Sequence, residues 1–256
     1  MPAEPGWPSV VLGQRGREDD GIPTEEFTSD RALLRIEGTG GGHVIIDREP
    51  PRATFVLSEP LTQDELLHPF LSPVGAAFSY WLGREAFHAG AFVAEGSAWG
   101  VVGEREAGKS SLLAWLALNG HPILTDDLLV VEAMTAMAGP RCIDLRPESL
   151  SLVGPGHRIT PARSGARSRL EVDAVASEVP LGGWVVLGWG DEVSLERLPP
   201  PARLGALGGH RAILLPPTRP AHLLELIGLP VWRLQRPPSW DLLPQVMGRL
   251  LDTLQA

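Results

Sequence analysis

Eight consecutive residues, from Gly103 to Ser110, have the types and spacing of a phosphate-binding loop. They read Gly-Glu-Arg-Glu-Ala-Gly-Lys-Ser, which follows the pattern GxxxxGK[ST]. In such a loop, backbone N–H groups and a helix N-terminus hold the phosphate, and the lysine, here Lys109, neutralises the β- and γ-phosphates. Lys109 is also the only lysine in the chain. The pattern predicts a nucleotide site, against the alternative of a chance glycine-rich turn.

The predicted nucleotide-binding segment extends into the residues that follow the loop. Its members are Gly103, Glu104, Arg105, Glu106, Ala107, Gly108, Lys109, Ser110 and Ser111. The Ser110 hydroxyl is a candidate ligand of Mg²⁺. Glu104 and Glu106 bring negative charge into a loop meant for polyphosphate. The cost is small if their side chains point outward, whereas an inward Glu106 would weaken ATP binding.

Two adjacent carboxylates, Asp126 and Asp127, end the next apolar segment. A strand that follows the loop helix can deliver both of them beside the terminal phosphate. One can hold Mg²⁺, and the other can accept the proton of an attacking hydroxyl. The alternative is an ordinary acidic turn between two strands.

A strand, a helix and a second strand must position these residues, and the sequence provides them in that order. Residues 98–102 are an apolar strand that runs directly into Gly103. Residues 110–119 have the apolar pattern and the glycine stop of a helix, and residues 122–126 read as a buried strand. This order predicts an α/β domain.

Three regions differ in composition. Residues 1–30 are polar, acidic and rich in Gly and Pro, and we expect a mostly disordered leader. Residues 31–84 read as a small β-rich module with a helix, and residues 85–256 as the nucleotide-binding domain. The expected strands cover 32–37, 43–47, 53–57, 91–94, 98–102, 122–126, 128–131, 183–188, 193–198 and 231–235. The expected helices begin near 62, with an interruption at Pro73, and cover 110–119, 200–207, 221–227 and 242–254.

The net charge of −9 and the single cysteine, Cys142, limit the class of protein. An acidic chain argues against a general binder of nucleic acids or of anionic membranes. No apolar run approaches the roughly 20 residues that span a bilayer, and the N-terminus does not have the pattern of a secretory signal. A single cysteine forms no internal disulfide, which favours a cytoplasmic location.

Together with its flanks, the loop resembles the HPr kinase/phosphorylase family. The resemblance rests on His88-Ala-Gly-Ala, on the loop through Lys109, and on Asn119-Gly120-His121 followed by Asp126-Asp127. It covers about residues 31–135. The chain is most similar to the smaller HPr-kinase-like serine kinases, some of which act on ribosomally made peptides such as lasso precursors.

The resemblance implies a P-loop α/β fold akin to the nucleotide domain of phosphoenolpyruvate carboxykinase, with a mixed sheet and flanking helices. It also implies phosphorylation of a Ser or Thr hydroxyl by ATP and Mg²⁺. By position, Asp126 is the expected catalytic base, Asp127 its partner or a ligand on the metal side, and His88 a histidine near them. The larger family members are oligomers, so a homo-oligomer is compatible with the resemblance.

The chain departs from the family pattern in and after the loop. Arg105 and Glu106 stand where the family loop has Ser and its middle Gly. Ser111 stands where the bifunctional enzymes have a metal-assisting Glu. These changes affect the groups that would hold the metal ion. A pseudo-kinase, which binds ATP without transferring phosphate, is therefore an alternative. The glycine-rich signature associated with phosphorylase activity is missing, so we expect no phosphorylase function.

The arginines outside the loop have two interpretations each. Arg141 and Arg146 flank an expected strand, where an arginine could stabilise charge on a transferring phosphoryl group or form an ordinary ion pair. Residues 155–170 are an arginine-rich loop that could guide an acidic substrate, and we favour the interpretation that it offsets local acidity.

These observations predict an ATP-dependent kinase of a Ser or Thr hydroxyl on a peptide or small protein. The expected catalytic residues are Lys109, Asp126, Asp127 and His88, and the candidate metal ligands are Ser110 and Asp127. The alternatives are a non-catalytic ATP-binding partner protein in a biosynthetic pathway and a kinase of a small-molecule hydroxyl.

Overall fold

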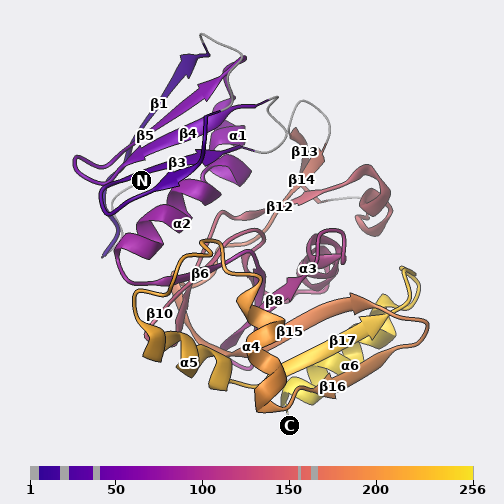
Figure 1. Cartoon of the computed structure of the whole chain (residues 1–256). Helices are drawn as coiled ribbons and strands as arrows, with labels where there is room; N and C mark the ends of the chain where they lie inside the picture. The colour runs from indigo at the N-terminus through magenta and orange to yellow at the C-terminus, as the bar shows by residue number, and fades with distance from the viewer. Residues whose placement is uncertain (1–5, 18–22, 37–40, 155–156, 163–166, 256) are drawn as a thin grey trace. The chain divides into compact units, whose positions relative to one another are not determined.

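The computed structural model describes residues 6–17, 23–36, 41–154, 157–162 and 167–255. The chain divides into two compact units, Met1–Leu82 and Gly83–Ala256 (Figure 1). No helix within the described ranges is long and apolar enough to cross a membrane.

The N-terminal unit is a five-stranded sheet with a helix packed on it. The strand order is β1-β5-β4-β3-β2. The strands are β1 (Val11–Gly16), β2 (Glu26–Phe27), β3 (Arg31–Arg35), β4 (His43–Asp47) and β5 (Arg52–Leu57). Apolar side chains of the central strands pack against α2 (Ser72–Trp81), mainly through Val74, Ala77 and Phe78. Alternation of apolar and polar residues along these strands is what gives the sheet one buried face.

The helical segment of this unit begins as the sequence predicts. Thr62 accepts a hydrogen bond from the N–H of Glu65, and the Glu65 carboxylate accepts one from the N–H of Thr62, which is a capping box. The segment comprises α1 (Gln63–Glu65), η1 (Leu66–Phe70) and then α2. Pro73 lies in the first turn of α2, where its missing N–H would have had no partner.

The expectation of a disordered leader over residues 1–30 needs correction where the structure describes it. β1 and β2 both lie in this range, and β1 pairs in parallel with β5 along its whole length. Its side chains are almost all exposed, so the strand is held by backbone hydrogen bonds rather than by apolar burial. A polar and acidic composition indicates that side chains are not buried, but it does not exclude backbone pairing in a sheet. The prediction of disorder was therefore wrong for these two strands. Residues 1–5 and 18–22 lie outside the described residues.

The C-terminal unit is built on a nine-stranded mixed sheet. Its main path has the order β6-β10-β11-β15-β8-β7-β9, with β17 paired to β15 and β16 paired to β17. The strands are β6 (Glu85–Phe87), β7 (Gly90–Ala94), β8 (Ser97–Gly103), β9 (Ile123–Thr125), β10 (Leu129–Glu132), β11 (Thr135–Met137), β15 (Glu178–Trp189), β16 (Ser194–Arg197) and β17 (Val231–Arg236).

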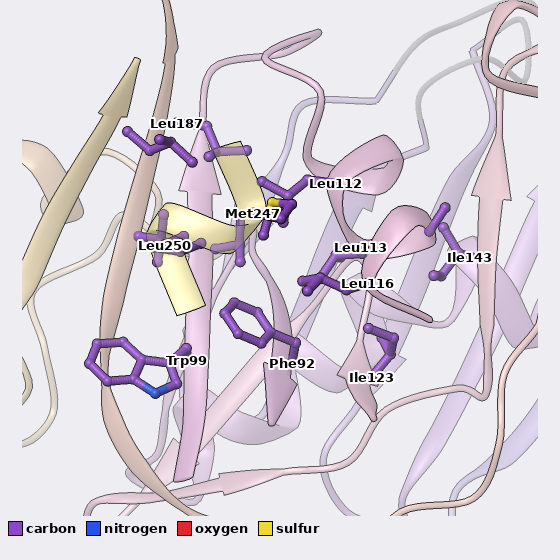
Figure 2. Close-up of a cluster of buried hydrophobic side chains, with 14 of the residues drawn as sticks. Phe92, Trp99, Leu112, Leu113, Leu116, Ile123, Ile143, Leu187, Met247 and Leu250 are labelled. Atoms are coloured by element: carbon purple, nitrogen blue, oxygen red, sulfur yellow. The ribbon is translucent and has the colours of Figure 1, made fainter. Parts of the chain in front are cut away.

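Helices cover both faces of this sheet. They are α3 (Lys109–Leu118), α4 (Pro200–Gly208), α5 (Pro220–Gly228) and α6 (Leu243–Gln255). On β8, Trp99 and Val101 belong to the core under α3 and α6, whereas Val102 belongs to the core under α4 and α5. Figure 2 shows the first of these cores, with Leu112 and Met247 facing each other from the two helices. The strands are therefore apolar on both sides, which is typical of a buried sheet between helical layers.

Four strand ends meet at one edge of this sheet. β8 and β17 both pair in parallel with β15. β9 is also parallel to β8, because β7 lies between them and is antiparallel to each. The carboxyl ends of β8, β9, β15 and β17 therefore lie at the same edge, which is where ligands bind in open α/β sheets.

A small antiparallel sheet completes the C-terminal unit. It contains β12 (Cys142–Leu145), β14 (Arg167–Glu171) and β13 (Ile159–Ala162), and η2 (Pro147–Leu152) follows β12. The structure corrects the expected arginine-rich loop at 155–170, since β13 and the start of β14 lie within it. Residues 155–156 and 163–166, including Arg163, lie outside the described residues.

The mixed α/β fold class agrees with the expectation from sequence, as do most elements of the C-terminal unit. The expected strands do not include β6, β11, β13 and β14, and β15 begins at Glu178 rather than at residue 183. Its early part contains Pro180 and pairs with β11, and its pairing with β8 has a register shift between Leu181 and Gly183. A proline and two adjacent glycines hide this part of the strand from a pattern of apolar residues.

Candidate functional site

The segment between β8 and α3 is a tight loop at the carboxyl edge of the sheet. Gly103 ends β8, where a Cβ atom would lie 3.0 Å from the carbonyl oxygen of Leu187 on the neighbouring strand. Gly108 precedes α3 with a φ of 83°, in the left-handed region that glycine adopts without strain. Glu106 also has a positive φ, of 69°. A residue other than glycine thus takes a left-handed conformation inside the loop.

The Lys109 side chain folds back over this loop. Its Nζ donates hydrogen bonds to the carbonyl oxygens of Gly103, at 2.6 Å, and of Glu104, at 3.2 Å. Partial burial lowers the pKa of Lys109, and the carboxylates of Asp126, Asp127 and Glu104 oppose this effect. The ammonium group is thus close enough to the two aspartates to interact with their charges.

Asp126 follows β9 and is buried. Burial, together with the nearby charge of Asp127, raises its pKa from an ordinary 3.8 to about 7. The backbone N–H of Asp144 donates to Oδ2 of Asp126 at 3.3 Å. Oδ1 is buried without a hydrogen bond of good geometry, although the Ser110 hydroxyl is near enough to lower the pKa somewhat. One carboxylate oxygen therefore remains to accept a proton or a ligand.

Asp127 and His88 lie together at the surface side of this site. The Nδ1 of His88 is 3.4 Å from Oδ1 of Asp127, with side chains 60% and 25% exposed, respectively. The structure therefore brings together four of the expected residues, Lys109, Asp126, Asp127 and His88, from three separate segments of the chain.

His210 is a fifth member of this group, and no motif or spacing in the sequence points to it. Its pKa is lowered by partial burial and then by the charge of Lys109, with smaller effects from Glu104 and His88. The backbone explains its location, because the N–H of His88 donates to the carbonyl oxygen of His210 at 2.7 Å. A β-bridge between Phe87 and Arg211 extends this pairing.

A buried ion pair holds the His210 segment in place. Nε of Arg211 lies 2.9 Å from Oε2 of Glu85, and both side chains are almost fully buried. The location of His210 therefore depends on contacts between segments more than 120 residues apart. No local sequence pattern predicts such contacts.

The Glu106 side chain points outward to an arginine. Its Oε1 lies 2.7 Å from Nη2 of Arg146, and this hydrogen bond and charge lower the pKa of Glu106. The side chain of Glu106 is 61% exposed. The sequence is compatible with an inward or an outward Glu106 side chain, and in the structure the side chain points outward. Arg146 is thereby an ion-pair partner in this structure, and Arg141 is exposed immediately before β12.

The β12–η2 segment makes two further contacts at the site. The hydroxyls of Ser111 and Ser149 are 3.0 Å apart and buried, which ties the first turn of α3 to η2. Asp144, whose N–H reaches Asp126, forms a buried ion pair with Arg169 at 2.8 Å. Ser111 was expected to bind nucleotide. Its hydroxyl instead has a buried partner within the protein.

Comparison with known proteins gives a distant structural relationship and no more. No protein-family model matches the chain, and no curated protein matches it in sequence. Among solved structures, the Hpr(Ser) kinase/phosphatase from Coxiella burnetii is similar with a TM-score of 0.35 and 14% sequence identity. The match covers 67% of this chain and 99% of that one.

Proposed function

We propose that this protein is an ATP-dependent phosphotransferase that moves the γ-phosphate to a Ser or Thr hydroxyl of a peptide or small protein. The observation that carries the proposal is the convergence of Lys109, Ser110 and Asp126 at one edge of the sheet. An ammonium, a hydroxyl and a buried carboxylate with one unpaired oxygen lie there around a loop at a helix N-terminus. Phosphoryl transfer to a hydroxyl uses groups of these kinds, a lysine for the phosphates, a hydroxyl for the metal ion and a carboxylate for the proton.

The loop provides the binding part of the proposed reaction. The backbone N–H groups of residues 104–108 and the N-terminus of α3 attract the triphosphate. Lys109 leaves the carbonyl oxygens of Gly103 and Glu104 and bears charge that develops on the β- and γ-phosphates. The outward orientation of Glu106 keeps its carboxylate paired with Arg146, so it opposes the phosphates less than an inward one would.

The carboxylates provide the proton transfer. Asp126 accepts the proton of the acceptor hydroxyl through Oδ1 as the oxygen–phosphorus bond forms and the bond to the β-phosphate breaks. The side chains of Asp127 and His88 are 25% and 60% exposed, respectively, so an acceptor carried by a peptide can reach them from solvent. Their exposure supports an acceptor larger than a free amino acid.

The donor set also fits Mg²⁺. The hydroxyl of Ser110 and the carboxylate of Asp127 are hard oxygen ligands of the kind that Mg²⁺ binds together with phosphates. When bound, the ion supplies positive charge that offsets the charge of the phosphates.

A non-catalytic ATP-binding partner protein is the second candidate. It is favoured by the left-handed Glu106 within the loop and by Ser111, whose hydroxyl is engaged with Ser149. Calorimetric titration with ATP, with and without Mg²⁺, separates the cases in combination with a turnover assay. Binding that is lost in Lys109→Ala, together with transfer that is lost in Asp126→Asn, supports the phosphotransferase. Tight binding without turnover supports the partner protein, and absence of binding overturns both.

A further inference from the structure

Trp189 and Arg236 lie next to the candidate phosphate loop on the flank opposite the carboxylates. Trp189 ends β15 and Arg236 ends β17, and the two residues are directly paired in the register of these strands. β15 is the neighbour of β8 on one side, whereas β7 and then β9, which leads into Asp126, lie on the other. The loop therefore has catalytic carboxylates on one flank and a tryptophan–arginine pair on the other.

Both side chains contact the loop itself. A Cβ atom at Gly108 would clash with Nη2 of Arg236 and would lie 3.2 Å from the Cη2 atom of Trp189. The glycine that precedes Lys109 is thus required by its backbone conformation and also by these two neighbours. The pair lies directly against the N-terminus of α3, where the partial charge of the helix favours an anion.

Arg236 is a buried cation with donors to spare. It is 1% exposed, and its Nε and Nη2 atoms have no hydrogen-bond partner. Burial lowers its pKa only to about 10, so the guanidinium is charged at neutral pH. Its Cζ lies 4.4 Å from the centroid of the Trp189 ring, which is a cation–π arrangement. Buried donors of this kind are normally satisfied, and the adjacent loop is where an anionic ligand would satisfy them.

Trp189 is exposed where a tryptophan would ordinarily be buried. It is 42% exposed, although Arg236 packs against its ring. The indole therefore has surface left for a flat partner. A ring held in this way is a rigid platform for stacking, because the guanidinium and the glycine restrict its rotation.

We propose that Trp189 and Arg236 form the nucleoside end of the site, where the adenine of ATP stacks on the exposed surface of Trp189. This inference rests on the proposed function. If the terminal phosphate lies toward Asp126 and Asp127, the nucleoside must leave the loop on the opposite flank. Arg236 is a positioning residue for the ring, because its guanidinium packs against the Trp189 indole.

The test compares ATP with inorganic tripolyphosphate, which has the phosphates but no base. In Trp189→Leu, we expect the affinity for ATP to fall about tenfold, because stacking on an aromatic side chain contributes roughly that factor. The affinity for tripolyphosphate should stay the same. Trp232→Leu is the matched control, since Trp232 lies on β17 away from the loop, and it should leave both affinities unchanged.

Two further readouts make the result specific. ATP should quench tryptophan fluorescence in the wild type and in Trp232→Leu but not in Trp189→Leu. In Arg236→Lys, ATP affinity should fall more than tripolyphosphate affinity, because an ammonium does not lie flat on an indole. Equal losses for the two ligands would contradict the positioning role.

The failures of the two proposals are distinguishable. If both ligands bind and Lys109→Ala abolishes their binding, but Trp189→Leu binds ATP as the wild type does, the nucleoside subsite is wrong and the phosphate loop stands. If neither ligand binds to the wild type, the proposed function fails and the subsite fails with it.

Discussion

The backbone N–H of Asp144 donates to the buried carboxylate of Asp126 across 3.3 Å. The Asp144 side chain is itself held by Arg169, whose Nε lies 2.8 Å from Oδ1. The small sheet of β12, β13 and β14 thereby fixes the position of the candidate catalytic base. Arg169 contacts Asp144, and Asp144 contacts Asp126. A substitution at one of these positions should therefore change the environment of the other two.

Arg169→Met should destabilise the protein by roughly 3–5 kcal/mol, because it removes the buried ion pair between Arg169 and the Asp144 carboxylate. Urea unfolding followed by circular dichroism measures the change in the free energy of unfolding. The double variant Arg169→Met/Asp144→Leu is the control, since it removes both charges, and it should recover most of the loss. A double variant as unstable as Arg169→Met would show that packing, rather than the loss of the ion pair, accounts for the effect.

Stability should fall as pH rises toward neutrality in the absence of Mg²⁺. The pKa of Asp126 is raised from 3.8 to about 7 in the folded protein. The folded state therefore binds more protons than the unfolded state between these values. This contribution is fully present below about pH 4 and is lost as pH passes about 7.

Asp126→Asn should remove this dependence. At pH 8 the variant should be more stable than the wild type by an amount on the order of 2–4 kcal/mol, and at pH 4 the two should be similar. Thermal or urea unfolding in EDTA at several pH values measures this, with Asp191→Asn, in an exposed turn, as the control. A wild type and an Asp126→Asn variant with parallel pH profiles would contradict the raised pKa.

Charge at Glu106 should tune the affinity for ATP. Glu106→Gln removes a negative charge from the loop and releases Arg146, so the affinity should rise roughly two- to threefold at low ionic strength. Arg146→Gln should lower it by a similar factor, and added salt should diminish both effects. Calorimetric titration provides the measurement.

The chain offers a matched control for the Glu106 variant. Glu95 is also a glutamate with a positive φ, but it lies in the turn at the opposite end of β8. Glu95→Gln should leave the affinity for ATP unchanged. An equal rise in both variants would mean that net charge, rather than the position of Glu106, governs binding.

The sequence was sufficient for the parts of the site that local patterns determine. A local stretch of about ten residues is enough to predict each of three elements. They are the apolar strand that ends at Gly103, the helix that follows Lys109 and the strand that leads to Asp126. These are also the segments whose side chains are buried on both faces of a sheet or against a helix. Their patterns were therefore strong, and the structure has the elements within one or two residues of the expected bounds.

The remaining parts depend on contacts between distant segments. His210 is placed by backbone pairing with the His88 segment, and Arg236 by the register of β17 against β15. Arg169 belongs to a basic stretch that reads as a solvated loop, yet its side chain is buried against Asp144. A polar residue that is buried because it has a partner gives no apolar pattern, so its location required the tertiary structure.

Transfer of a labelled γ-phosphate from ATP is the measurement that tests the central claim most directly. The acceptor should be a library of peptides that each carry one Ser or Thr, with an otherwise identical Ala library as the blank. We expect Mg²⁺-dependent label on the hydroxyl library, a loss of at least about a hundredfold in Asp126→Asn, and a comparable loss in Lys109→Ala. Label transfer that persists unchanged in both variants, or no transfer when ATP is shown to be bound, would contradict the account.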